Sequence, residues 1–205
     1  LGKKKKIAAL IEQYQLDLDD VEIIDPRSEK EEERRNEFAA LLYEKRQRRG
    51  MTLVEAQHEM RERNYFGSTM VETGQADALI SGLTRNYPDT IRPALQMIGV
   101  DKEAGVNRIA GMYILITKRG PIFLADTTIN ENPTAEELAE ITVMAAESVK
   151  RFKMKPNVAL LSYSNFGSSV GDDPDKMRRA AKILHEQHPN LTVDGEMQAN
   201  FALNK

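Results

Sequence analysis

The fold is decided by residues 158–194, which read VALLSYSNFGSSVGDDPDKMRRAAKILHEQHPNLTVD. The apolar run Val158–Tyr163 predicts a strand buried on both faces. Asp173-Pro174 is typical of a helix start, with Asp173 as the cap, and apolar residues then recur at helical spacing as far as Leu184. Leu191–Asp194 predicts a second strand. Strand, helix and strand in this order indicate a parallel sheet.

The segment before this stretch also predicts strands and a helix. Ile109–Thr117 and Ile122–Asp126 flank a Lys-Arg-Gly-Pro turn, so an antiparallel pair is expected. Thr134 and Glu137 have the spacing of a capping box, which starts a long helix after Pro133. The second half of the chain is therefore expected to be α/β.

The first hundred residues are expected to alternate helices and strands as well. The expected strands are Val21–Asp25 and Ala76–Ser81; the expected helices are one over Ile7–Tyr14, one that ends at Gly50, one that starts at a capping box of Thr52 and Glu55, and one that begins at Pro93. This reading places Arg92 at a junction between strand, loop and helix.

The two ends of the sequence favour a fragment. The chain stops at Lys205, barely past the last expected strand, and a parallel strand needs helices on both faces to bury its apolar side chains. We therefore expect the natural protein to continue beyond Lys205, and the beginning to be clipped too.

Composition limits the classes of partner. The formal net charge of −3 and a pI near 5.8 give no basic field for nucleic acid or for an anionic membrane. The chain has no cysteine, which excludes disulfides and thioester intermediates and fits a cytoplasmic location. No stretch approaches the roughly 20 apolar residues that span a bilayer, so a soluble protein is expected.

Two arginine-containing segments are candidate anion sites. Ser81-Gly82 precedes Arg92, whose planar guanidinium suits a phosphate, although Arg92 could equally pair with Asp89 or Glu72 while Gly82 makes a turn. The cluster Arg46, Arg48 and Arg49 could bind an anion or satisfy the carbonyl end of its helix. The second reading is favoured for Arg48 and Arg49.

Two further segments follow the expected strands. Residues 162–169 are rich in serine and glycine and could donate hydrogen bonds to a phosphate or acyl group, or form an ordinary mobile loop. Asp194 and Glu196, in the run 194–198, could act as a general base, a metal ligand or a helix cap, of which the cap is favoured. The histidines lack metal-ligand company, so no metal site is expected.

These segments resemble those of phosphate acetyltransferases and phosphate butyryltransferases. The shared sequence motifs are Ser81-Gly82, Asp89–Gln96, Leu161–Ser164 and Asp194–Gln198. The segments 84–90 and 161–169 are similar, more closely still, to the C-terminal domain of bacterial NADP-dependent malic enzymes. No Walker A loop or G-x-G-x-x-G motif is present, so dehydrogenase activity must lie elsewhere in such a parent.

The resemblance implies an architecture. It is a three-layer α/β/α fold of the isocitrate/isopropylmalate dehydrogenase type, with two subdomains and a cleft between them. The expected subdomains are residues 1–102 and residues 103–205, the second of them truncated at its C-terminus.

The resemblance also implies ligands and site residues. By motif position Arg46 and Arg92 hold the phosphate and the CoA-side anion. The other expected contacts with acyl phosphate or CoA are Ser81, Gly82, Ser162, Ser164 and Gly167. The base of the family and a serine-arginine pair lie beyond Lys205, so no catalytic residue is expected here and the fragment alone is expected to be inactive.

Two departures from the family pattern favour regulation over acyl transfer. Asn86, Tyr87 and Pro88 replace small hydroxyl residues, and Phe166 replaces a lysine. The expected role is to bind acetyl-CoA as an inhibitory effector and to help form homo-oligomers, in a parent whose malic enzyme domain carries NADP and a divalent metal. The alternatives are an active acyltransferase and a purely structural oligomerisation module.

Overall fold

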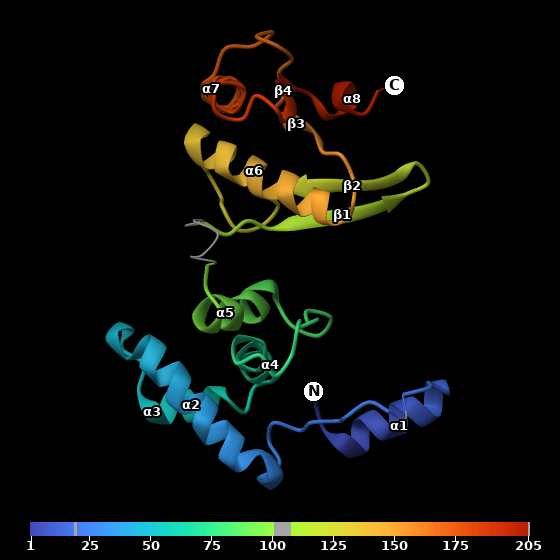
Figure 1. Cartoon of the computed structure of the whole chain (residues 1–205), viewed down its shortest axis with the longest axis vertical. Coiled ribbons are helices and arrows are strands. Elements are labelled where there is room, and N and C mark those ends of the chain that lie inside the picture. The colour runs from blue at the N-terminus through green and yellow to red at the C-terminus, as the bar shows by residue number, and fades with distance from the viewer. Residues whose placement is uncertain (19, 101–107, 205) are drawn as a thin grey trace. The chain divides into compact units, whose positions relative to one another are not determined.

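The computed structural model describes residues 1–18, 20–100 and 108–204. The chain forms two compact units, Leu1–Asp101 and Lys102–Lys205, and each is described by itself (Figure 1). The boundary expected between residues 102 and 103 lies outside the described residues and stays a prediction. In the described part, no helix is both long and apolar enough to cross a bilayer.

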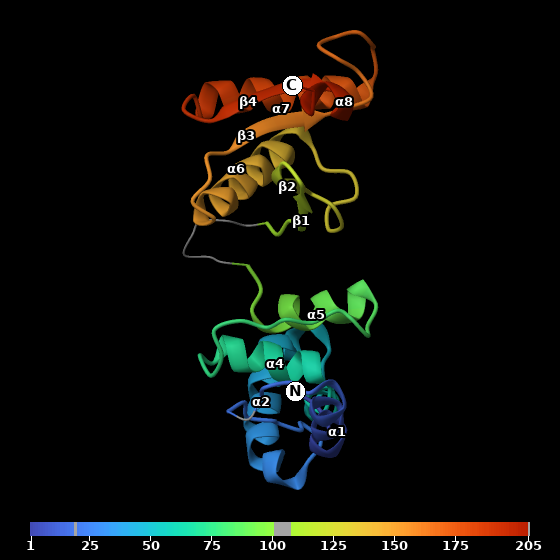
Figure 2. The same cartoon turned by 90° about the vertical axis from the view of Figure 1, so that its right-hand side faces the viewer.

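The described part of the first unit is helical. Its helices are α1 (Lys4–Tyr14), α2 (Glu32–Arg46), α3 (Leu53–Glu59), α4 (Arg63–Glu72) and α5 (Tyr87–Met97), with short 3-10 turns at Glu29–Glu31 and Gln47–Arg49. The expected capping box at Thr52 and Glu55 is confirmed, and Gly50 ends the turn after α2 with a φ of 91°. Phe38, Leu42 and Phe66 lie in its core, and Figure 2 shows α4 and α5 side by side.

Both strands expected in this unit are wrong. Residues 21–25 and 76–81 are irregular, and every strand among the described residues belongs to the second unit. A strand needs a paired neighbour, and neither segment has one here. The side chain of Ile80 is accordingly 98% exposed.

The expected helix start at Pro93 is also wrong. Helix α5 begins at Tyr87, with Pro88 in its first turn, where a missing N–H costs nothing. Pro93 lies inside the helix and leaves the carbonyl of Asp89 without its usual donor. The side-chain amide of Asn64 donates to that carbonyl at 3.2 Å instead. Arg92 therefore lies on a helix and not at a junction.

The second unit begins with the expected antiparallel pair. Strands β1 (Met112–Thr117) and β2 (Gly120–Ala125) pair in the register Met112↔Ala125, which confirms the predicted hairpin. Helix α6 (Ala135–Arg151) begins at the predicted capping box of Thr134 and Glu137 and contacts β2 (Figure 1).

The parallel unit is confirmed as well. Strand β3 (Asn157–Leu161), helix α7 (Asp172–Gln187) and strand β4 (Thr192–Met197) follow in order, β3 pairs with β4 in parallel, and α8 (Ala199–Ala202) comes last. Helix α7 starts at Asp172 with Gly171 as its cap, so the expected cap at Asp173 is wrong.

Strand β3 is less buried than predicted. Of its five residues only Leu160 is buried, because the described strands form two separate two-stranded sheets. A hollow of about 580 Å³, lined by β2, α6 and β3, leaves one side of β3 open. The mixed α/β class is confirmed; the three-layer arrangement and the cleft stay predictions.

Candidate functional site

In the first unit, the positive charges of Arg46 and Arg92 both affect the pKa of one tyrosine, Tyr65. Arg46 ends α2 and is half-buried, and Arg92 lies exposed on α5. Burial and the charge of Glu59 raise the pKa of Tyr65, while the positive charges of Arg92 and Arg46 lower it. The two guanidinium groups therefore lie close enough to Tyr65 for their charges to be felt at the same hydroxyl.

Tyr65 and Asn64 hold this region together from α4. The Tyr65 hydroxyl donates to Gln96 Oε1 on α5 at 2.8 Å. Asn64 is buried, and its Oδ1 accepts a hydrogen bond from the Ser81 hydroxyl at 2.6 Å while its amide donates to α5. One side chain thus fixes Ser81 and the helix that carries Arg92.

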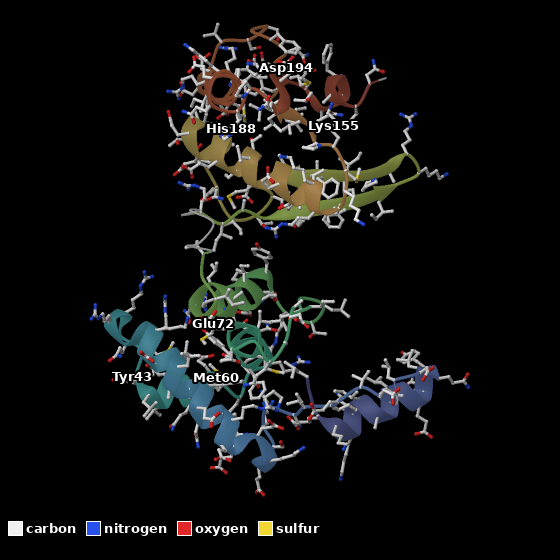
Figure 3. All side chains as sticks on the ribbon, viewed as in Figure 1. Tyr43, Met60, Glu72, Lys155, His188 and Asp194 are labelled. Carbon is white, nitrogen blue, oxygen red and sulfur yellow. The ribbon has the colours of Figure 1, made fainter. Side chains whose placement is uncertain are left out.

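Among the described residues, Arg92 forms neither of the ion pairs, with Asp89 or with Glu72, that the sequence left open. Glu72, which is labelled in Figure 3, pairs with Lys45 on α2. Asp89 contributes its backbone carbonyl to Asn64, and within the described residues Arg92 pairs with neither acid. Gly82 has a φ of 120° with open space around it, so its backbone conformation is what favours glycine.

In the second unit, residues 162–169 form the loop after β3. Phe166 and Gly167 both have positive φ, at 45° and 85°, which makes a tight turn. The N–H of Ser162 donates to the carbonyl of Met197 at 2.9 Å, and Gln198 donates its N–H to Asn165 Oδ1 at 2.8 Å. The loop is therefore tied to the end of β4.

Glu196 lies at the centre of that loop. Its side chain is fully buried, and Oε1 accepts hydrogen bonds from the Ser164 hydroxyl, the Gly167 N–H and Arg178 Nη1, each at 2.8 Å. The expected helix cap is wrong for Glu196, because residues 194–197 belong to β4 itself. Asp194, which is labelled in Figure 3, is exposed on that strand, and its carboxylate accepts from the N–H of Gly195.

The hydrogen bonds decide the charge of Glu196. Burial raises the pKa of its carboxyl, but the Gly167 N–H, the Ser164 hydroxyl and the positive charge of Arg178 outweigh burial, and the pKa lies below its usual value. Glu196 is thus held ionised and is a poor proton acceptor.

The expected loop contacts divide into two groups. Ser164 is fully buried, and Gly167 is exposed but gives its N–H to Glu196, so the donors of both residues point into the protein. Ser162 is half-buried, and Ser168 is exposed beside the Ser164 hydroxyl at 3.2 Å. The direct contact of any of them with a ligand stays a prediction.

One polar turn was missed by the sequence analysis. Asp126 follows β2, and its carboxylate accepts from the N–H groups of Gly111, Thr128, Ile129 and Asn130 and from the Asn130 side chain. Burial raises the pKa of Asp126, but these donors together hold it below its ordinary value of 3.8. No motif marks such a turn in one sequence.

The described residues offer cations and neutral donors. They contain no group of three or more acidic or histidine side chains arranged to hold a metal ion. His185 Nε2 contacts the carbonyl of Val193 at 2.9 Å, so this imidazole joins α7 to β4. Chemically, the two units can contact an anion with guanidinium groups and a polar ligand with hydroxyl groups.

The comparisons with known proteins agree on one family. A family model described as "Phosphate acetyl/butaryl transferase" matches residues 1–205. The chain is 39% identical to an NADP-dependent malic enzyme of Haemophilus influenzae, over all of this chain and 27% of that protein. It is 35% identical to a phosphate acetyltransferase of Helicobacter pylori, over all of this chain and 38% of that protein.

A solved structure gives the same result. The EutD phosphotransacetylase from Staphylococcus aureus matches with a TM-score of 0.75 and 35% identity, over 96% of this chain and 59% of that one. The chain thus spans less than two thirds of each of these relatives. The resemblance stated from the motifs is confirmed for both groups of relatives.

Proposed function

Because the chain belongs to the phosphate acetyl/butaryl transferase family, we propose that it binds acetyl-CoA as a regulatory ligand of an NADP-dependent malic enzyme. The observation that carries the proposal is that Arg46, at the end of α2, and Arg92, on α5, both exert their positive charge on the Tyr65 hydroxyl of α4. Two guanidinium groups suit the phosphates of CoA, since each presents a planar fork to an oxyanion.

The loop 162–169 supplies the second part of the proposal. Its exposed hydroxyl groups, on Tyr163 and Ser168, are neutral, and Phe166 stands where a family lysine would add charge. Neutral groups suit the acyl and amide portions of acetyl-CoA better than its phosphates. Each contact lies within one unit.

Regulation is favoured over acyl transfer by two departures from the family pattern. Asn86, Tyr87 and Pro88 stand where the family has small hydroxyl residues, and Phe166 stands where it has a lysine. Both changes remove groups that would bind the phosphate of an acyl phosphate. The identity of 39% to a malic enzyme, against 35% to an acetyltransferase, points the same way.

The test uses the intact protein in two assays. Malate oxidation is measured with and without acetyl-CoA, and acetyl transfer from acetyl phosphate to CoA is measured in the same sample. The proposal predicts inhibition of malate oxidation and no transfer at enzymatic turnover. Transfer at ordinary turnover would make the chain part of a working acyltransferase, and insensitivity to acetyl-CoA would remove the regulatory role.

We propose that assembly between copies of the chain accompanies this regulation. Strand β1 supports this, because Tyr113, Ile114, Leu115 and Ile116 are all exposed and apolar, with Ile116 at 83%. Ile116→Glu is expected to lower the molar mass measured by light scattering on the intact protein. Lys118→Glu, in the adjoining turn, is the control. A strictly monomeric wild-type protein would contradict the idea.

A further inference from the structure

We propose that Glu196 is a positioning residue, which fixes the loop 162–169 in the conformation that meets the acyl ligand. The proposal rests on the proposed function for the identity of that ligand. Glu196 itself is fully buried and does not touch solvent. Its effect on a ligand must therefore pass through the loop.

The contacts of Glu196 reach the turn of the loop from two sides. Its backbone carbonyl accepts from the N–H of Phe166 at 2.9 Å, and Oε1 accepts from the N–H of Gly167 at 2.8 Å. These two consecutive residues are the ones with positive φ. One strand residue thus holds both amides of the turn.

The same carboxylate orients the serines. It accepts the hydroxyl proton of Ser164, and Ser164 Oγ in turn accepts from the N–H of Ser169 at 3.0 Å. The hydroxyl of Ser168 accepts from the N–H of Asn165 at 3.0 Å. Because the Ser164 proton goes to Glu196, the Ser168 hydroxyl, 3.2 Å from Ser164 Oγ, donates its own proton to Ser164. Glu196 thereby fixes the hydroxyl network beneath the exposed edge of the loop that a ligand would meet.

The energetics argue against a role in packing alone. Among the described residues, Glu196 Oε2 is buried and has no hydrogen-bond partner. Burying an ionised carboxylate with one oxygen unpaired is costly, and an apolar residue would fill the same space without that cost. Arg178, which pairs with it, is itself about one third exposed. A negative charge here is best explained by the donors that it gathers.

The experiment compares Glu196→Gln with Glu147→Gln in the intact protein. Both variants remove one carboxylate, but Glu147 is exposed on α6, where it pairs with Lys150. Glutamine keeps the size of the side chain while its NH₂ or its weaker acceptor faces the donors of the loop. The first measurement is hydrogen exchange, by mass spectrometry, of peptides that span residues 162–170.

Exchange of these peptides is expected to speed up about tenfold in Glu196→Gln, which corresponds to about 1.4 kcal/mol of lost local stability. Glu147→Gln should leave it unchanged. Arg178→Gln, which removes one of the three donors at a partly exposed position, should give a smaller change in the same direction, and it serves if Glu196→Gln does not fold. Equal exchange in Glu196→Gln, Arg178→Gln and the control would overturn the proposal.

The second measurement is the acetyl-CoA concentration that gives half-maximal inhibition of malate oxidation. It is expected to rise about tenfold in Glu196→Gln, because the exposed hydroxyl of Ser168 is no longer held in place. Faster exchange with an unchanged inhibitory concentration would overturn the link from loop to ligand. If the wild-type protein ignores acetyl-CoA but exchange still rises, the proposed function fails while the control of the loop by Glu196 stands.

Discussion

The two candidate regions place their polar groups in opposite ways. In the helical unit, long arginine side chains extend from α2 and α5, and an apolar core with the Asn64 and Tyr65 hydrogen bonds sets the helices beneath them. In the α/β unit, short hydroxyl and backbone groups of one loop are held by a buried carboxylate. A long arginine side chain can reach a ligand from any well-packed helix. A short hydroxyl or backbone donor can do so only if its loop is held in place, and here a buried carboxylate holds it.

The largest effect is expected from a substitution that disrupts the close pairing of β3 and β4, on which the loop depends. A Cβ at Gly195 would stand 2.6 Å from the carbonyl oxygen of Leu160, and Gly195 has a φ of 145°. Gly195→Ala is expected to cost about 3 kcal/mol or more, from the clash and the strained backbone together. Urea unfolding followed by circular dichroism measures it.

A substitution at a second glycine shows how much of this cost comes from the steric clash and how much from the strained backbone. Gly167 also has positive φ, but a Cβ there would meet open space. Gly167→Ala should therefore cost only about 1 kcal/mol. If both substitutions cost the same, close approach of the strands is not what requires Gly195.

The next effect concerns the acid sensitivity of the α/β unit. Asp126→Asn is expected to cost about 2 kcal/mol at neutral pH, because several N–H donors lose a charged acceptor. The pKa of Asp126 is lowered in the folded state, so its contribution is present above its ordinary value of 3.8 and disappears as pH falls through the lowered value.

The measurement is the free energy of unfolding of wild type and Asp126→Asn between pH 7 and pH 2. The difference between the two proteins should shrink as the pH falls below about 4. The exposed Asp194→Asn serves as the control and should change stability little at any pH. A difference that stays constant down to pH 2 would contradict the assigned role of Asp126.

The smallest effect sharpens the comparison at one motif that both units share. Thr52→Ala and Thr134→Ala each remove a capping-box hydroxyl that accepts from the N–H three residues later. Each is expected to cost about 1 kcal/mol in the stability of its own unit, as followed by hydrogen exchange of α3 or α6. Thr192→Ala, exposed on β4, is the control. If Thr52→Ala and Thr134→Ala lose no more stability than Thr192→Ala, the capping role of the two threonines is contradicted.

The fold was predictable where its cause is local. Both capping boxes and the parallel pair β3–β4 were predicted because each depends on residues close in the sequence or on one short crossover. The strands expected at 21–25 and 76–81 were wrong because pairing needs a neighbouring strand, which a local apolar run does not supply. The start of helix α5 was predicted wrongly because a proline inside a helix needs a substitute donor. Here Asn64, 25 positions before Asp89, donates to the Asp89 carbonyl that Pro93 leaves free.

The site was predictable by residue type more than by role. Arginines and a serine-glycine loop are visible in the sequence, and their motifs pointed to the right family. Glu196 was taken for a cap because its partners, Ser164 and Gly167, lie about thirty residues away and only the strand pairing brings them together. Tyr65 and Asp126 carry no motif at all.

The most direct test of the central claim is the affinity of the intact protein for acetyl-CoA, measured by calorimetry in the wild type, Arg92→Ala and Arg49→Ala. Arg49 is exposed in the turn after α2 and is the matched control. Loss of a charge-assisted contact should cost about 1.5–3 kcal/mol, so Arg92→Ala should bind roughly 10- to 150-fold more weakly while Arg49→Ala binds as the wild type does. Equal affinity in all three proteins would contradict the account.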